Sequence, residues 1–268
     1  MKTMKTMRNF GRVIEVMTAG MKFSSDKYNI EGKVPFDTDT LPNESEIKLW
    51  NLAETTINNI KRGKVLMLNA GYKGDVGLLL HGYISNVDTV WEGVDKITTI
   101  HVLDSEDLDK RVVKEIAFAE NTLASKIIKQ MASYIGLPIA QFNLNQDYRY
   151  QDGYTAKGKV TEIIAKVAKD CGTSVYINKN KLYVRNLRSG GDNVFAVNTK
   201  TGLIGTPGRF EKDGAKGFNI KMQLQHRVTT ASVLNLTYSR FSGKAHVRSG
   251  SHTFTRTGDF VTEVEAIL

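Results

Sequence analysis

Two long parts of the chain alternate apolar and polar residues with the two-residue period of a β-strand. In the first part, extended runs cover Arg12–Thr18, Ile30–Thr38 and Ser45–Leu52, and a last run covers Lys96–Leu103. Glycine turns separate many of these runs, and short alternating strands with frequent turns are typical of an antiparallel sandwich or barrel. The stretch Glu54–Lys61 is predicted to form one helical turn between two strands.

The period changes to that of a helix between residues 106 and 187. An amphipathic helix is predicted from apolar residues at four-residue steps, namely Leu123, Ile127, Met131 and Ile135. Asn121 or Thr122 is expected to cap this helix and Gly136 to end it. A second helix has an apolar face made of Val160, Ile163, Ile164, Val167, Ala168 and Cys171. A hairpin with its turn at Asn178–Lys181 follows.

Strand-like alternation returns in the last part and continues to the closing run at residues 260–266. Two polar stretches, Asp104–Arg111 and Ser189–Asp192, separate the three parts and are interpreted as domain joints. The sequence therefore predicts an α+β protein with three domains. They are an N-terminal β domain at residues 1–105, an α/β insertion of two helices plus a hairpin at 106–188, and a C-terminal β domain at 189–268.

The start of the second helix resembles a phosphate-binding loop, because Gly153, Gly158 and Lys159 have the spacing G-x-x-x-x-G-K. Such a loop needs a Ser or Thr hydroxyl after the lysine for Mg²⁺ and a buried parallel strand before the first glycine. Val160 occupies the hydroxyl position, and the preceding residues are polar and aromatic. We therefore predict a turn into a helix. Nucleotide hydrolysis at Lys159 is the least favoured hypothesis.

The net charge of the chain and its distribution exclude few classes of function. The net charge is +9, but lysine and arginine are spread along the chain without a run of five. This distribution disfavours nucleic-acid binding as the main role, and an acidic protein neighbour explains the charge at least as well. The single cysteine, Cys171, is predicted to be a small buried hydrophobe. The apolar runs are too short for a membrane span, and charged residues interrupt the start of the chain where a secretion signal would need an apolar core.

Candidate catalytic and metal-binding residues do not form a convincing set. The five histidines, His81, His101, His226, His246 and His252, match no metal-binding pattern. His246 and His252 flank a predicted turn and are expected to meet across a hairpin, with no third ligand. Glu106, Asp107 and Asp109 are assigned to a solvated linker, and Glu263 and Glu265 to a solvent or partner face. The sequence predicts no enzyme, no cofactor and no metal site.

Local motifs nevertheless have a recognisable order. The first β part contains Asn51-Leu52 at a strand end, then Gly71-Tyr72 in "NAGY", then Gly82 and Ile84 in "HGYI". The last part contains "TGLIGTP", the most specific string, with Gly202, Leu203, Ile204, Gly205 and Pro207, and then His252 before Gly258-Asp259. In this order the motifs resemble the baseplate hub family of contractile phage tails and phage-tail-like bacteriocins, including late control protein D-like and Gram-positive phage tail hubs.

The resemblance implies a structural role. Such hubs are homotrimers whose two antiparallel β-barrel domains per chain give six similar barrels in a ring, which joins a sixfold tail tube to a threefold spike. The implied partners are the tail tube protein, the spike or needle, the tape measure protein, and baseplate wedge or cell-wall hydrolase subunits. Nucleic acid is implied at most as DNA passing through the channel. The expected place is the tail baseplate of a virion or bacteriocin particle, assembled in the host cytoplasm.

Two further expectations come from single segments. Thr253–Thr257 is predicted to be an exposed strand edge that neighbouring subunits complete. The tyrosines Tyr148, Tyr150 and Tyr154 motivate an alternative function, a tail-associated protein that binds cell-wall glycan without catalysis. Packing of these tyrosines at a domain joint is the favoured interpretation.

Overall fold

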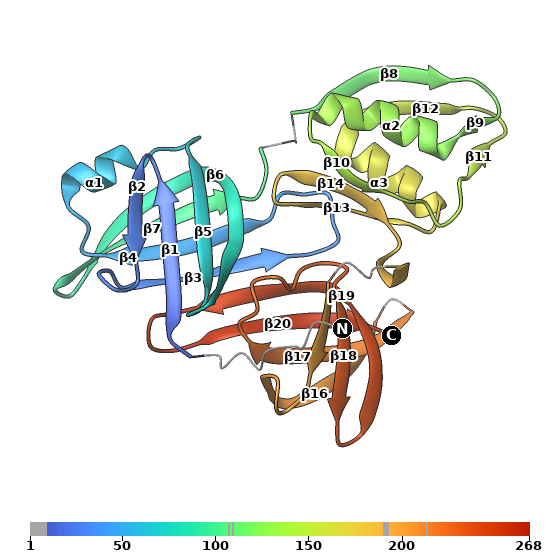
Figure 1. Cartoon of the computed structure of the whole chain (residues 1–268). Coiled ribbons are helices and arrows are strands. Elements are labelled where there is room, and N and C mark those ends of the chain that lie inside the picture. Colours follow the sequence, from blue (N-terminus) through green and yellow to red (C-terminus); the bar gives the residue numbers. More distant parts are fainter. Residues whose placement is uncertain (1–9, 107, 109, 190–192, 213) are drawn as a thin grey trace.

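The computed structural model describes residues 10–106, 108, 110–189, 193–212 and 214–268. The chain is mostly β-sheet, with 56% of residues in strands and 13% in helices. Figure 1 shows three regions, which follow one another along the chain.

The first β region contains one short helix and seven strands: β1 (Arg12–Thr18), β2 (Met21–Ser24), β3 (Ile30–Phe36), β4 (Glu44–Trp50), α1 (Glu54–Asn59), β5 (Val65–Tyr72), β6 (Asp75–Glu92) and β7 (Asp95–Leu103). Their alternating burial places one apolar face of each strand in a common core, and the predicted helical turn is confirmed as α1. β6 has 18 residues and is the longest strand of this region, and the end of its hairpin with β7 is exposed from residue 88 to residue 94.

The middle region contains β8 (Val112–Phe118), β9 (Thr122–Leu123), α2 (Ala124–Ile135), β10 (Ile139–Phe142), β11 (Arg149–Tyr150), β12 (Tyr154–Lys159), α3 (Val160–Asp170), β13 (Ser174–Asn178) and β14 (Lys181–Arg185). The two predicted helices and the predicted hairpin are confirmed. The expected apolar faces pack together in the core of this region, and Cys171 is buried there as expected. Gly136 ends α2 in the left-handed conformation that a C-cap glycine supplies.

The cap at the start of α2 differs from the prediction. Neither Asn121 nor Thr122 is the capping residue, because the helix begins after Leu123, whose side chain cannot accept a hydrogen bond. Instead, the backbone N–H of Ser125 donates to Oδ1 of Asp147 at 2.9 Å. A carboxylate 22 residues away therefore satisfies one of the free donors of the first turn.

The last β region contains η1 (Leu187–Ser189), β15 (Val194–Val197), β16 (Leu203–Lys212), β17 (Ala215–Gln223), β18 (Val233–Tyr238), β19 (Phe241–Phe254) and β20 (Phe260–Ile267). Its strands form a second core, to which Phe36 of the first β region also contributes. The first core in turn contains Leu224, Phe254 and Phe260 of the last β region. The two β regions therefore share apolar packing on both sides of their boundary.

A single hydrogen-bonded sheet links the two β regions. The strand order is β16-β17-β20-β19-β3-β4-β7-β6-β5-β1-β2, with β15 and β18 branching from β19. The link is the antiparallel pair β3–β19, in register from Gly250 opposite Phe36 to Phe254 opposite Gly32. Over the described residues this order is open at β16 and β2, so no sheet closes on itself.

Two predictions about the segment that forms β19 and its end are wrong. The segment interpreted as a "VRSGS" turn, Val247–Ser251, lies inside β19, where a register shift between Val247 and Ser249 absorbs the irregular sequence. The expected exposed strand edge at Thr253–Thr257 is also wrong, because Thr253 and Phe254 end β19 with strands on both sides, and residues 255–257 lie between β19 and β20. Thr253 pairs with Val261 on one side and with Lys33 on the other.

Candidate functional site

The segment that resembles a phosphate-binding loop is a strand and not the predicted turn. Residues Tyr154–Lys159 form β12, which pairs antiparallel with β8 in a two-stranded sheet. Gly158 has a φ of 106° at a register shift in this pair, a conformation that suits glycine. Val160 is buried in the helix core. A phosphate loop follows a parallel strand, so this geometry supplies a helix start and not a cradle.

The two histidines expected to meet across a hairpin lie on the same strand. His246 and His252 are both in β19, six residues apart, with different cross-strand partners, Ile267 and Thr262. The prediction failed because the intervening turn does not exist. Within the part of the chain that the structure describes, no group of three or more His, Cys, Asp or Glu side chains is arranged to hold a metal ion.

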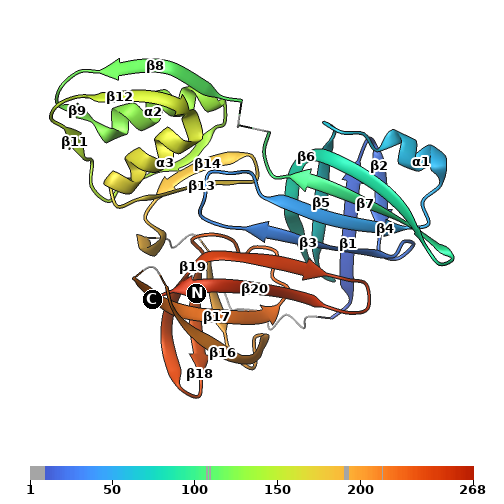
Figure 2. The ribbon, with the colours of Figure 1, turned by 180° about the vertical axis from the view of Figure 1, so that it is seen from behind.

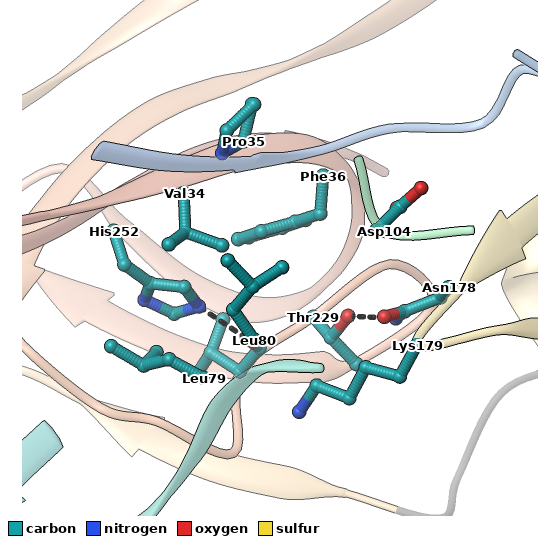
Figure 3. A pocket seen from close by; sticks show the side chains of 11 residues that line it. Val34, Pro35, Phe36, Leu79, Leu80, Asp104, Asn178, Lys179, Thr229 and His252 are labelled. Carbon is teal, nitrogen blue, oxygen red and sulfur yellow. Dashed lines mark hydrogen bonds between the residues drawn. The ribbon is translucent and has the colours of Figure 1, made fainter. Parts of the chain in front are cut away.

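The three regions meet at a small enclosed cavity of about 10 Å³ (Figure 3). Its walls come from β3, β6 and the residue after β7, from the turn between β13 and β14, and from β19 with the loop before β18. Val34 and Leu80 provide apolar surface, while His252 and Lys179 bring polar groups into the same buried space. The cavity is too small for a ligand, so its residues act as a joint.

His252 is a fully hydrogen-bonded neutral side chain. Its Nε2 lies 3.1 Å from the carbonyl oxygen of Val228, and its Nδ1 lies 2.9 Å from Oγ1 of Thr262. A carbonyl oxygen can only accept a hydrogen bond, so Nε2 carries the proton. Nδ1 therefore accepts a hydrogen bond from the Thr262 hydroxyl. The same hydroxyl accepts one from the Gln225 N–H. Burial lowers the pKa of His252 to about 3. These contacts fasten β19 to β20 and to the loop before β18.

Lys179 places the β13–β14 turn between the two β regions. Its Nζ donates to the carbonyl oxygen of Leu78 in β6 at 2.8 Å, and burial lowers the pKa of this lysine to about 8. The neighbouring Asn178 donates its side-chain amide to Oγ1 of Thr229. On the other side, the Asn180 N–H donates to the Asp104 carbonyl at 2.9 Å. One tight turn therefore contacts both β regions and fixes the middle region on them.

Asp104 is buried, although it begins the polar stretch that is interpreted as a domain joint. Its side chain is only 6% exposed, and Ser105 beside it is fully buried. Both carboxylate oxygens accept from Asn43, one from the backbone N–H at 2.9 Å and one from the side-chain amide at 3.1 Å. Burial raises the pKa of Asp104 to about 7 despite these bonds, and the charges of Asp37 and Asp39 act in the same direction. Asp107 and Asp109 lie outside the described residues.

The motif residues of the first β region lie in two places. Asn51 has a left-handed φ of 56°, and its side chain bridges to β7 by donating to Asp95 at 2.8 Å and accepting from the Lys96 N–H at 2.9 Å. Leu52 and Ile84 are buried in the first core. Gly82 lies so close to β7 that an added Cβ would be 2.1 Å from the Leu103 carbonyl oxygen. These residues hold the β4–β7–β6 sheet together.

The second place is the boundary with the last β region. Gly71 allows the close β5–β6 turn, because a Cβ there would be 2.1 Å from the Asp75 carbonyl oxygen. Tyr72 packs edge-on against Phe260 of β20, with ring centroids 5.2 Å apart. Asp75 forms a 2.6 Å ion pair with Arg227. The "NAGY" motif and His252 therefore lie at the same boundary, on opposite sides of it.

The "TGLIGTP" residues lie apart from the other motifs, on β16 at one end of the sheet. Gly202 precedes the strand with a φ of 100°, and Gly205 has a φ of 69° inside it, where pairing with β17 is interrupted between Ile204 and Gly208. Leu203 packs against the last core, Ile204 is exposed, and Pro207 is buried. Proline and a break in pairing are typical of edge strands. The string therefore lies in an edge strand, which is hydrogen-bonded to β17 and to no other strand among the described residues.

The tyrosine cluster lies within the middle region and not at a domain joint. The rings of Tyr148, Tyr150 and Tyr154 follow one another at centroid distances of 4.9 and 4.8 Å. Tyr150 and Tyr154 pack on the core of this region, and the Tyr150 hydroxyl donates to Asp170 at 2.6 Å. This packing gives two of the three rings a structural role.

Sequence reasoning missed one prominent feature, the tip of the β6–β7 hairpin. Residues 88–94 are all exposed, including Trp91 at 69% and Val94 at 91%. The available signal was the string "VWEGV", where apolar residues surround a glycine turn with too little alternation for one face to be buried. The structure places this string beyond the core, far from the cavity of Figure 3 (Figure 1).

Comparison with known proteins decides the family. A family model described as baseplate hub gp41 matches residues 44–240, well over half of the chain. The chain belongs to this baseplate hub family. The matched span begins in β4 and ends after β18, so it includes the middle region and parts of both β regions, but not β1–β3, β19 or β20. No curated protein matches the sequence.

Solved structures show the same fold at very low identity. A tail protein from Neisseria meningitidis MC58 has 6% identity and a TM-score of 0.68, with 97% of both chains covered. A 43 kDa tail protein of prophage MuSo2 from Shewanella oneidensis has 9% identity and a TM-score of 0.67, with 96% of this chain and 97% of that chain covered.

A third structure extends the likeness beyond phages. The c3393 protein of E. coli, described as a component of the type VI secretion system similar to the T4 tail proteins gp27 and gp5, has 10% identity and a TM-score of 0.63. The match covers 94% of this chain and 76% of that chain. The family is a baseplate hub family, and the Neisseria and Shewanella proteins are tail proteins. The chain is thus a structural protein of the phage-tail type. Among the described residues, no helix is long and apolar enough to cross a membrane.

Proposed function

We propose that the chain is the structural hub of a contractile tail baseplate, in a phage or a phage-tail-like bacteriocin. Three copies form a ring in which each chain supplies two barrel-like β domains, residues 1–105 and 189–268, with the insertion 106–188 on the outside. Six similar β domains then face the sixfold tail tube, while the true threefold symmetry fits a spike. Membership of the baseplate hub family supports this assignment.

The observation that carries the proposal is the β3–β19 ladder. It joins the two β regions through five consecutive residue pairs, so that one chain behaves as a rigid double unit. A hub that matches two different symmetries needs two tube-like units at a fixed spacing in each chain. A flexible linker would not hold that spacing, whereas a shared sheet and shared cores do.

The open ends of the sheet support assembly with further copies. Among the described strands, β2, β15 and β16 each have one hydrogen-bonded neighbour, so three edges of the sheet are unpaired within the chain. Unpaired edges promote association, and head-to-tail copies that close into a ring cover such edges. The motif residues then have structural roles. Asn51, Leu52, Gly82 and Ile84 hold one β domain, Gly71, Tyr72 and His252 hold the boundary, and Gly202–Pro207 shape the edge strand.

The neighbours in the particle follow from this position. The tail tube protein lies on one side of the ring and the spike or needle on the other, with the tape measure protein, wedge subunits or a cell-wall hydrolase subunit nearby. The net charge of +9 suits acidic surfaces on these proteins, or DNA in the channel. The role requires no catalysis and no cofactor.

The experiment is a mass measurement combined with imaging. Purified protein is analysed by light scattering and by negative-stain microscopy, alone and with tails assembled without it. The proposal predicts a species three times the 29.9 kDa of one chain, with threefold images, that restores tail assembly. A species that stays monomeric and never enters a tail contradicts it.

A further inference from the structure

The tip of the β6–β7 hairpin is an exposed apolar surface on a rigid support. Val90 is 51% exposed, Trp91 69% and Val94 91%, so each side chain lies largely in solvent. The strands below remain paired up to Glu92 opposite Asp95, and the hydroxyls of Thr89 and Thr98 are 3.2 Å apart across the ladder. An exposed tryptophan on a preformed hairpin is the kind of residue that dominates protein interfaces.

The same tip is acidic. Between residues 86 and 95 the sequence contains Asp88, Glu92 and Asp95 but no lysine or arginine. The first cation, Lys96, is engaged locally, because its Nζ is 2.7 Å from Glu54 and 5.7 Å from the centre of the Trp91 ring. The tip therefore presents tryptophan and valine surface together with negative charge, and its partner should be aromatic and basic.

A groove with that character lies in the last β region of the same chain. It has a volume of about 550 Å³ and is lined by Phe210, Phe218 and Phe241 together with the cations Arg209 and Lys216. The Arg209 guanidinium lies 5.9 Å from the centre of the Phe218 ring. Glu211 also lines the groove and is 3.4 Å from Lys216, so among the described lining side chains two cations stand against one carboxylate. β16, which forms one wall, is an edge strand.

The groove and the tip lie at opposite ends of the molecule. Leu268, the last residue, lines the groove, and Figures 1 and 2, which view the chain from opposite sides, both place the C-terminus and the β6–β7 turn at opposite sides. The tip therefore cannot reach the groove of its own chain. Two complementary surfaces at the two ends of a rigid molecule are the arrangement that a head-to-tail ring requires.

We infer that the β6–β7 tip of one copy inserts into the aromatic groove of the next copy, with Trp91 against the half-buried rings of Phe210 and Phe241 and Glu92 beside Arg209. This inference rests on the ring of the proposed function and assigns the contact that closes it. The occupant is a second copy of this chain, because the same chain offers both surfaces and they match in apolar character and charge.

Disulfide trapping tests the contact directly. The native Cys171 is buried, so Val94→Cys and Lys216→Cys introduce the only accessible thiols among the described residues. Mixing the two single variants under mild oxidation should give a cross-linked dimer, and the double variant should give dimers and trimers. Pairing Val94→Cys with Lys126→Cys, an exposed position on α2, is the control and should give no cross-link.

Two substitutions measure the energetics. Trp91→Ala should raise the dissociation constant of the assembly by about 30-fold or more, whereas Tyr134→Ala, an exposed aromatic change on α2, should leave it within about threefold. Glu92→Arg and Arg209→Glu should each weaken assembly, and the two changes together in one chain should restore it. Thermal unfolding of each variant should match the wild type, because the positions are exposed.

The outcomes separate the inference from the function on which it rests. A wild-type trimer with no Val94–Lys216 cross-link and with unchanged assembly of Trp91→Ala overturns the tip contact but leaves the hub function intact. A cross-link from Val94→Cys only to another tail protein in assembled particles also overturns it. A wild-type protein that stays monomeric in all conditions and never enters tails overturns the hub function itself.

Discussion

The ring of Phe254 in β19 lies over Gly32, the residue directly opposite it in β3. A Cβ at position 32 would be 2.8 Å from Cζ of that ring and 2.3 Å from the Glu46 carbonyl oxygen. The other end of the ladder repeats the arrangement. Phe36 lies opposite Gly250, and a Cβ at position 250 would be 2.8 Å from Cζ of the Phe36 ring. An aromatic ring over a cross-strand glycine fixes the register of a strand pair. The junction of the two β regions is thus held in register at both ends.

Gly32→Ala is predicted to lower the free energy of unfolding by about 1–3 kcal/mol, because the new methyl group meets backbone that cannot move aside. Gly208→Ala is the matched control. A Cβ there has only the Asn219 Cβ nearby, at 4.0 Å, so the change should be close to neutral. Guanidinium denaturation of both variants checks the prediction. Equal stabilities for the two variants would contradict a tight junction.

His252 is predicted to make the protein less stable in acid. Its folded pKa of about 3 lies below the value of about 6.5 for an unfolded histidine. As the pH falls, the unfolded chain therefore takes up the proton first, which favours unfolding. The stability that the neutral His252 contributes is present above about pH 6.5 and is lost as the pH falls towards 3. His252→Gln should flatten that part of the profile and cost about 1–3 kcal/mol at pH 7 through the lost hydrogen bonds. Denaturant titrations between pH 4 and 7 check this, and a wild-type slope in the variant would contradict it.

Asp104 is predicted to make the folded protein less stable as the pH rises, the opposite of the effect of His252. Its folded pKa of about 7 lies above the unfolded value of about 3.9, so the folded chain takes up the proton first. The resulting stabilisation is present below about pH 3.9 and is lost as the pH rises through 7. The free energy of unfolding of Asp104→Asn, relative to the wild type, should therefore rise as the pH increases from 4 to 8. A flat difference for Asp104→Asn between pH 4 and 8 would disprove the assignment.

Asp147 is predicted to stabilise α2 from a distance. Removing its carboxylate in Asp147→Ala leaves the Ser125 N–H without this acceptor and should cost about 1 kcal/mol. Asp147→Asn keeps an acceptor oxygen and should lose less. Hydrogen exchange at the first turn of α2, together with the overall unfolding free energy, measures both effects. An alanine variant with unchanged exchange at Ser125 would show that the bond contributes nothing.

Local periodicity was sufficient for the middle region. Residues such as Ile127 and Met131, or Ile164 and Val167, return to one face of a helix at each turn, so the sequence alone identifies the buried side. Gly136 as the helix stop follows from the same local physics. Both helices and the hairpin after them were predictable because every contact involved is close in sequence or repeats along it.

Contacts between distant segments were not predictable. Gly32 and Phe254 are more than two hundred residues apart, and nothing in either strand specifies the other as its neighbour. The same applies to Asp104, whose acidic surroundings in the sequence suggested solvent but whose partner Asn43 lies in another part of the fold. The motifs indicated the family, whereas the joint that these residues build appeared only in the structure.

The most direct test of the central claim is a cryo-electron microscopy map of the tail baseplate that contains this chain. The account predicts three copies in one ring below the tail tube. Each copy should contribute its two β regions to a six-membered arrangement, with the β3–β19 ladder intact in every copy. A ring built from six copies, or a particle in which this chain lies outside the central ring, would contradict it.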